Sequence, residues 1–311
     1  MGLGIGLGFL HQNPIILALI EISFIIENFK IRVANDGGTF EAESNLTSIL
    51  TNLDNSVGLN TLSMVLTPNA FKTGKAYSVI GPTDFTVVRN TTATTTNSLR
   101  KIVLAAANVP RLTYLTSGGN PFLLVEPQKT NLLTYSEDYT DASWLKQLVN
   151  INTSVVAAPF AGKFGVKVTT TQTNAECNIR KTQAGNQLSH SIYGKKGELN
   201  YLVFRSSASG SFTNVAFNLN TGNIDQNGAP AFFTAKMENV GNGWYRCSVY
   251  IVSSSTSNLM LWIISDNPTT NNNAVVGSGL FLFGAQQEAS IVPTSYIPTV
   301  ASAVTRNADV I

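Results

Sequence analysis

The sequence predicts an all-β protein whose C-terminal part is a β-sandwich of the jelly-roll type. Short apolar runs recur along the chain, Gly- and Asn-rich turns separate them, and no long helical pattern occurs beyond residue 128. The 311 residues include 24 glycines and 11 prolines, which commonly punctuate strands. With 43% hydrophobic residues, the chain has enough apolar surface to bury a core.

The first element is an apolar segment at residues 15–26, IILALIEISFII, which follows Asn13 and Pro14. Asn caps helices and Pro tolerates the first helical position, but the many isoleucines favour a strand equally well. The segment is shorter than the ~20 residues of a transmembrane helix. We expect it either to be buried in the chain's own core or to anchor the chain against a partner subunit.

A short amphipathic helix is expected at residues 40–57, where leucine, isoleucine and valine follow helical spacing. Together with the apolar segment it forms an expected anchor and oligomerisation region at residues 1–58. A small β-rich connecting region is expected at residues 59–127. Its strand-like runs, separated by turns, are residues 61–67, 76–81, 84–90 and 122–126.

The expected sandwich domain covers residues 128–311. In two of its runs apolar residues alternate with others, as Val215 and Phe217 do in one and Cys247 and Val249 in the other. One face of each strand is therefore expected in the core and the other against solvent or a ligand. The strand-like runs are residues 164–170, 189–195, 200–206, 214–220, 244–252, 259–265 and 280–288.

Composition excludes several function classes. Only 12% of residues are charged and the net charge is +2, which argues against a basic nucleic-acid-binding face. Cys177 and Cys247 are too few for a disulfide framework, and Cys247 is expected to be a buried free thiol. The carboxylates at residues 137–141 give only a weak calcium signal, so no metal and no cofactor is expected.

Catalysis has little support in the residues. The chain has two histidines, His11 and His190, in unrelated contexts, and a Ser-His-Asp arrangement cannot be built from them. His190 is expected to be a structural residue with its hydrogen bonds satisfied. We therefore expect that the protein is not an enzyme.

Binding of a neutral polar ligand fits the residues better. Sugars are recognised by aromatic faces together with amides, hydroxyls and a few charges, and a sheet face can present them. Trp262 would be the best anchor if it faced outward, although packing between the sheets is the favoured interpretation. The candidate glycan-binding residues, all on expected strands, are Arg205, Asn218, Arg246, Trp262, Gln286 and Glu288.

The C-terminal half also resembles a module of bacteriophage virion proteins, including tail-fibre, collar and head-fibre components. Three blocks carry the resemblance: EPQKTNLLTYSEDYTDASW (126–144), GNGWYRCSV (241–249) and FGAQQEASIVPTSYIPTVASAVTRNADV (283–310). Gln287 and Ala289 depart from the leucine and glycine that are usual there. Residues 65–94 resemble a lead segment of such proteins from phages of Bacteroidetes-type hosts.

This resemblance implies a carbohydrate-binding-like jelly roll carried on a virion, without a catalytic residue to transfer. We expect a surface fibre, spike or tail component that attaches to host glycans and contacts other virion proteins. Trimers are common in the resembled group, so a homotrimer is expected. The alternatives are a purely structural capsid, collar or fibre subunit and, more remotely, a polysaccharide depolymerase.

Within these blocks, Tyr296 is expected to pin the closing strand. Arg306 and Asp309 are expected to make polar contacts near the terminus.

Overall fold

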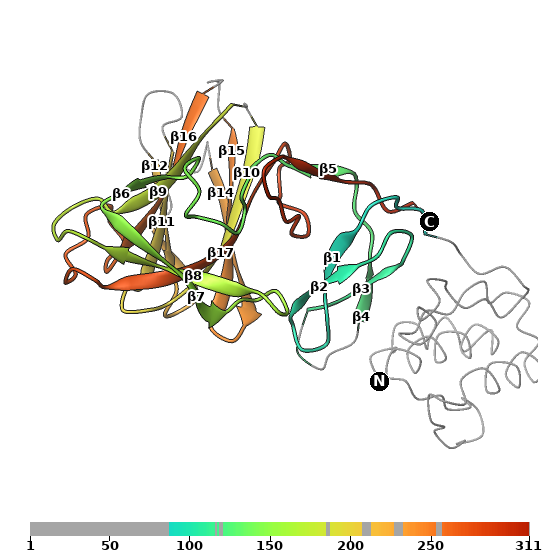
Figure 1. Ribbon diagram of the computed structural model, residues 1–311, viewed down its shortest axis with the longest axis horizontal. Helices are drawn as coiled ribbons and strands as arrows, with labels where there is room; N and C mark the ends of the chain where they lie inside the picture. The colour runs from blue at the N-terminus through green and yellow to red at the C-terminus, as the bar shows by residue number, and fades with distance from the viewer. Residues whose placement is uncertain are drawn as a thin grey trace, which may run out of the picture. The chain divides into compact units, whose positions relative to one another are not determined.

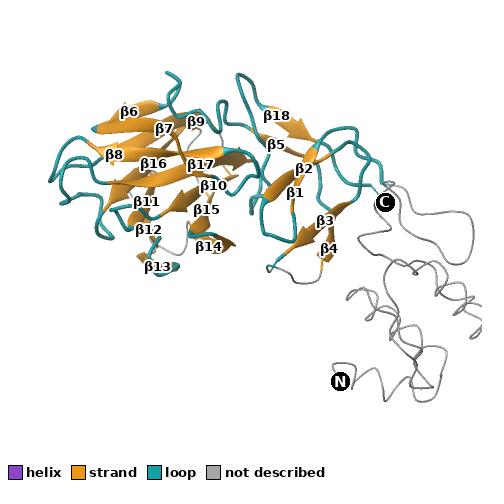
Figure 2. Cartoon of the chain, turned by 60° about the horizontal axis from the view of Figure 1, so that its bottom comes forward, coloured by secondary structure: helices purple, strands orange, loops and turns teal. Residues whose placement is uncertain are grey.

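The computed structural model describes residues 87–115, 117, 121–184, 187–206, 213–226, 233–252 and 257–310. The expected apolar segment at 15–26, the helix at 40–57 and the strand-like runs at 61–67 and 76–81 lie outside these residues. All regular structure in the described part is β-strand, which confirms the all-β prediction (Figure 2). That part contains no helix with the length and apolar character that a membrane span requires.

Two six-stranded sheets form a β-sandwich (Figure 1). The first, here named the β10 sheet, has the order β14 (Phe233–Gly241), β15 (Trp244–Val252), β10 (Gln187–Lys195), β17 (Gly279–Glu288), β8 (Phe164–Thr170) and β7 (Val149–Ala157). The second, the β11 sheet, has the order β13 (Asn223–Gln226), β12 (Thr213–Asn218), β11 (Tyr201–Ser206), β16 (Ser257–Ser265), β9 (Asn178–Ala184) and β6 (Leu145–Gln147). Paired strands run antiparallel, and the chain passes repeatedly between the two sheets, as in a jelly roll.

Three two-stranded pairs complete the described strands. They are β1 (Ala93–Thr96) with β2 (Ile102–Ala105), β3 (Arg111–Tyr114) with β4 (Pro121–Leu124), and β5 (Lys129–Asn131) with β18 (Val304–Arg306). The chain divides into two compact units. The larger unit comprises residues 93–104 and 126–307, and its described part contains the sandwich.

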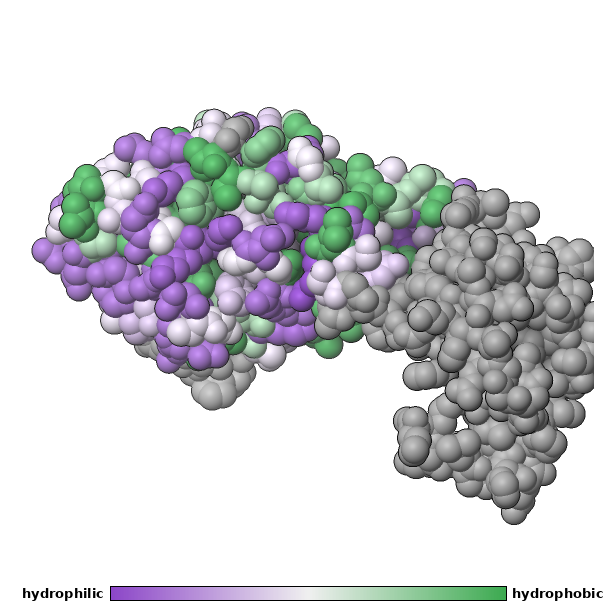
Figure 3. Space-filling model, turned by 90° about the horizontal axis from the view of Figure 1, so that it is seen from below, coloured by the Kyte–Doolittle hydropathy of each residue, from purple (hydrophilic) through white to green (hydrophobic). Residues whose placement is uncertain are grey.

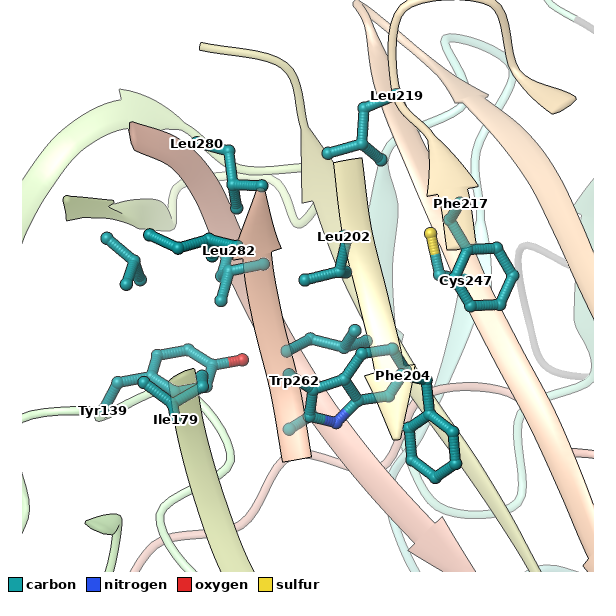
Figure 4. Close-up of a cluster of buried hydrophobic side chains, with 14 of the residues drawn as sticks. Tyr139, Ile179, Leu202, Phe204, Phe217, Leu219, Cys247, Trp262, Leu280 and Leu282 are labelled. Atoms are coloured by element: carbon teal, nitrogen blue, oxygen red, sulfur yellow. The ribbon is translucent and has the colours of Figure 1, made fainter. Parts of the chain in front are cut away.

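The core of the sandwich is built from side chains that alternate along the strands. On β11, Leu202 and Phe204 point inward and are fully buried, whereas Tyr201 before them and Arg205 after them point outward. Trp262 on β16 meets the Phe204 ring edge-on, with centroids 4.9 Å apart (Figure 4). Burying each such side chain contributes about 1.5–3 kcal/mol, so this layer holds the two sheets together.

The expected alternation of β12 and β15 is confirmed. Val215 and Phe217 on β12, and Cys247 and Val249 on β15, all lie in the same buried cluster. The turn before β15 also forms as expected, because Asn242 and Gly243 both adopt the positive φ that a tight hairpin turn demands. Local sequence therefore decides both the faces of these strands and the turn that starts β15.

The smaller unit is held by a buried charge cluster. In its described part, Val88 forms a bridge with Val310, close to the end of the chain. The carboxylate of Asp309 accepts a hydrogen bond from Arg89 Nη1 at 2.7 Å and also binds the guanidinium of Arg111. Both arginine side chains are 0% exposed. Asp309 therefore joins the end of the chain to two segments that precede it by 220 and 198 residues.

Candidate functional site

The outer face of the β11 sheet gathers polar side chains from five of its strands. Since Leu202 and Phe204 point into the core, Tyr201 and Arg205 of the same strand point out. The strand register then places their cross-strand partners on the same side. We name this surface the polar face, and its residues are Gln147, Glu176, Asn178, Arg180, Tyr201, Arg205, Asn214, Asn218 and Asp225.

An ion pair spans the middle of the polar face. Arg205 lies on β11 and its guanidinium Nη1 binds the carboxylate of Glu176, which comes just before β9. Because β16 lies between β9 and β11, this pair must pass over β16. The two side chains are 22% and 21% exposed, so the pair is open to a ligand.

Three apolar residues share this side of the sheet with the ion pair. Val203, Ala216 and Ile263 lie in one row across three strands, and each is 0% exposed. They offer no polar group of their own. A ligand on the polar face would therefore meet the flanking amides and charges first.

A second polar group lies toward the β13 edge. The Tyr201 hydroxyl donates to Asp225 Oδ2 at 2.7 Å, and Asn218 Nδ2 donates to the same oxygen at 2.7 Å. The hydrogen bond to the Asp225 carboxylate raises the pKa of Tyr201, with a smaller contribution from burial. Tyr201 therefore keeps its proton at neutral pH and presents a neutral aromatic ring.

A third polar group lies toward the β6 edge. Arg180 Nη1 donates to Gln147 Oε1 at 2.9 Å, and Asn178 Nδ2 donates to Glu176 Oε1 at 3.2 Å. Asn178 is fully buried, and its Oδ1 has no hydrogen-bond partner among the described residues. Leaving such an acceptor unpaired costs about 1–3 kcal/mol.

Of the six residues that the sequence suggested, only Arg205 and Asn218 belong to the polar face. Trp262 lies on the other side of the same sheet, 2% exposed and within the core. The packing interpretation of Trp262, which the sequence favoured, matches this position.

The other three suggested residues lie on the outer side of the β10 sheet, buried by a different part of the chain. We name residues 294–300 the closing segment. Arg246 Nη2 donates to the Thr294 carbonyl at 2.7 Å, and Glu288 Oε2 accepts from the Thr294 amide at 2.6 Å. Gln286 Oε1 accepts from the Ile297 amide, also at 2.6 Å. The closing segment thus occupies the side of β15 and β17 that the sequence assigned to solvent or a ligand.

Sequence reasoning did not single out Glu176, Arg180, Tyr201 or Asp225. A signal was present in the run NIRK, where Asn178 and Arg180 alternate with buried Ile179. Glu176 precedes that strand, and its proximity to Arg205 depends on β16 lying between two strands that are distant in sequence.

His190 does not contribute to the polar face. It lies in β10, fully buried, with its ring stacked on Phe204 at a centroid distance of 5.7 Å. Burial lowers its pKa to about 3, so the ring is neutral at ordinary pH. The expectation of satisfied hydrogen bonds is wrong, because neither ring nitrogen has a partner among the described residues.

The carboxylates at 137–141 are used within the fold. Asp138 Oδ1 accepts from the Thr140 amide at 3.0 Å, and Asp141 Oδ1 accepts from the Ser143 amide at 2.8 Å. Glu137 pairs with Lys163 at 3.3 Å. Within the described residues, no group of three or more His, Cys, Asp or Glu side chains has the arrangement of a metal site.

The blocks that resemble phage virion modules meet around the closing segment. Tyr296 packs edge-on against Phe160 and Tyr193, and its hydroxyl lies 2.8 Å from Ser136 Oγ. Tyr296 thus pins the segment as expected, but residues 294–300 are irregular rather than a strand. Arg306 contacts Glu126 at 3.4 Å and donates to the Pro127 carbonyl at 2.9 Å. These block residues serve the fold.

A groove of about 120 Å³ lies on the outer side of the β10 sheet, away from the polar face. One wall carries Lys236 and Glu238, which form an ion pair at 2.7 Å. The other wall carries Ile291 and Val292, which are 65% and 58% exposed. On the coloured surface in Figure 3, hydrophilic residues alternate with apolar patches.

No protein-family model and no curated protein matches the chain. The chain is similar to several solved structures, and three of them share low identity with it. The enzymatically active domain of bacteriophage CBA120 tailspike protein 4 shares 12% identity at a TM-score of 0.30, over 50% of this chain and 21% of that one. The CBM22-1–GH10 modules of Clostridium thermocellum endo-1,4-beta-D-xylanase 10B, complexed with xylohexaose, share 12% identity at a TM-score of 0.32, over 56% and 30%.

The third is the CBM2 module of the evolved Dit of Lactobacillus casei BL23 phage J-1. It shares 10% identity at a TM-score of 0.24, over 54% of this chain and 100% of that one. Two of the three proteins come from phages. The chain spans less than a third of the length of the first two.

Proposed function

We propose that this chain is a bacteriophage virion protein whose sandwich attaches to a host-surface glycan through the polar face. The glycan-binding part of this proposal is carried by one observation, the arrangement of side chains on the polar face. Amides, a tyrosine and an accessible Arg205–Glu176 pair lie side by side on one sheet, fixed by strand register. Planar arrays of this kind suit the hydroxyl groups of an extended sugar chain.

The chemistry of the polar face fits a polyhydroxylated ligand. Arg205 and Glu176 supply a donor and an acceptor at one place, and the ring of Tyr201 offers an apolar surface beside Asp225. Charge-assisted hydrogen bonds of this kind are stronger than neutral ones. Sugar hydroxyls can engage both partners of the ion pair because each hydroxyl donates and accepts.

That the chain is a virion protein is supported by the resemblance of three sequence blocks to phage virion proteins. These blocks are residues 126–144, 241–249 and 283–310. Contacts with other virion proteins and assembly as a homotrimer belong to the same proposal. We also propose that the protein binds the glycan without cleaving it. His190 lies in the core, and the carboxylates of the polar face are held by Arg205, Tyr201 and Asn218.

The test uses the full chain on an array of bacterial surface polysaccharides. We expect Arg205→Gln to weaken binding by about tenfold or more, because it removes one member of the exposed pair. The matched control is Lys236→Gln, which alters an exposed ion pair on the other sheet. Circular dichroism checks that both variants fold. Absence of binding to every polysaccharide, or equal affinities for the two variants, would contradict the proposal.

A purely structural virion subunit is the second candidate, and exposed apolar residues favour it. At the β6–β8 edge of the sandwich, Leu145, Val155 and Phe164 are 48%, 48% and 59% exposed. Apolar side chains at a sheet edge are typical of subunit contacts. Loss of particle assembly in Phe164→Ser, together with no glycan binding by the wild type, would favour this role. Release of oligosaccharides by the purified protein would instead revive a depolymerase.

A further inference from the structure

The charges on the polar face are unevenly distributed, although Arg180 and Arg205 are matched in number by Glu176 and Asp225. Arg205 has the Glu176 carboxylate as its partner. Arg180 lies on β9, across β16 from Arg205, and donates to the neutral amide oxygen of Gln147. No carboxylate of the described residues lies within ion-pair distance of Arg180. The β6 end of the polar face therefore carries a positive charge without a counter-ion from the described chain.

The contact with Gln147 also orients the Arg180 guanidinium. One nitrogen, Nη1, is held at 2.9 Å by the Gln147 side chain of the edge strand β6. A guanidinium is planar and carries five N–H groups, so a group held at one nitrogen still has donors for a second acceptor. Carboxylates match this planar donor set in a two-point contact.

The surroundings of Arg180 suit a sugar rather than a bare anion. Leu145 lies directly across the strand pair from Arg180, on the same face, and is 48% exposed. It offers an apolar surface to the C–H side of a sugar ring. Two residues along β9, the buried Asn178 lies on the same side of the sheet. The exposed apolar side chain of Leu145 and the cation of Arg180 are thus neighbours.

We propose that Arg180 recognises a sugar carboxylate, so that the glycan bound by the polar face is an acidic polysaccharide containing uronic acids. This inference rests on the proposed function, because it names the ligand class and a specificity-determining residue of the same face. Arg205, whose charge is neutralised by Glu176, then contacts sugar hydroxyls, and Arg180 binds the carboxylate of the uronic acid.

The experiment compares polyuronates with their esters. The probes are polygalacturonate and alginate, each beside its methyl ester, in which the same chain lacks the negative charge, and dextran as a neutral polymer. We expect the full-length protein to bind at least one polyuronate about tenfold or more tightly than its ester. Salt at about 0.5 M should reduce this preference, because it screens exposed charges.

Three variants test whether Arg180 causes the preference for the polyuronate over its ester. Arg180→Gln should bind the polyuronate and its ester equally, Arg180→Lys should recover part of the preference, and the control Lys236→Gln should keep it. Circular dichroism and thermal melting verify folding. A preference that persists in Arg180→Gln overturns the inference.

Other outcomes separate this inference from the proposed function. Binding to dextran or to array polysaccharides without preference for any polyuronate overturns the acidic class and leaves glycan attachment standing. Binding to no polysaccharide overturns both.

Discussion

The Ile297 amide donates to Oε1 of Gln286 at 2.6 Å, and this contact fixes the closing segment on the outer side of the β10 sheet. Gln286 also donates through Nε2 to the Thr294 carbonyl at 3.2 Å. Both ends of its amide are therefore used inside the fold. Gln286 is of a residue type that suits sugar binding, but here its side chain holds the closing segment in place.

Replacing Gln286 by Leu should destabilise the sandwich. The variant leaves the Ile297 amide and the Thr294 carbonyl with one partner fewer in a buried place, at a cost of about 2–3 kcal/mol. For a domain of this size we expect the melting temperature to fall by roughly 5–10 °C. Differential scanning calorimetry measures this shift. Gln172→Leu, at an exposed loop position, is the control and should melt like the wild type; a Gln286→Leu variant that also does so would refute the locking role.

His190 should make the stability of the sandwich depend on pH. Burial holds its folded-state pKa at about 3, below the ordinary value of 6.5. Above pH 6.5 the ring is neutral in both the folded and the unfolded state, so it does not make the free energy of unfolding depend on pH. As the pH falls from 6.5 toward 3 the unfolded chain binds a proton that the folded chain does not, so stability is lost at up to about 1.4 kcal/mol per pH unit.

This pH dependence can be isolated by mutation. Between pH 6 and pH 5, where few carboxylates titrate, urea unfolding of His190→Leu should show a shallower pH dependence than the wild type. Gln172→Leu should keep the wild-type slope. Identical slopes for wild type and His190→Leu would show that His190 is accessible to protons in the folded state.

Asp309 should control the stability of the smaller unit. Asp309→Asn removes the buried charge that compensates Arg89 and Arg111, and breaking such a cluster costs about 3–5 kcal/mol. We expect amide hydrogens of residues 105–115 to exchange about tenfold faster or more, as read by mass spectrometry. Val310→Ala, at a 56% exposed side chain, is the matched control. Unchanged exchange in Asp309→Asn would mean that the cluster adds no stability.

The two cysteines should be unreactive in the native protein. Both are buried free thiols, as expected for Cys247, and burial raises the pKa of Cys177 and, more strongly, of Cys247. Because the thiolate is the reactive form, an aromatic disulfide reagent at pH 8 should label neither until guanidinium is added. Ala142→Cys, at an exposed position, should add one thiol that reacts at once. Labelling of a native cysteine would show that the core opens readily.

Much of the sandwich could be predicted from local sequence. The run 244–252 coincides with β15, and the runs at 164–170 and 280–288 match β8 and β17 to within a residue. Alternating apolar residues mark these strands because one of their faces is buried. The sandwich strands β6, β7, β9, β13 and β14 were not predicted. In β9 and β14, lysine, threonine and glutamate weaken the alternation.

The polar face could be predicted only in part. Arg205 and Asn218 stand out in the sequence because they lie on clear strands, whereas Glu176 precedes a strand that was not recognised. Its pairing with Arg205 follows from the strand order β11-β16-β9, which joins segments far apart in the chain. No local pattern contains that order.

The sequence by itself determined the all-β class, the main strands of the sandwich and the inward residues, because period-two alternation is a local property of the chain. Only the tertiary structure decided which outward residues stay accessible. Arg246, Gln286 and Glu288 alternate outward like Arg205, yet the closing segment buries them through Thr294 and Ile297. Exposure of a strand face depends on what the rest of the chain lays over it, and that is settled by long-range packing.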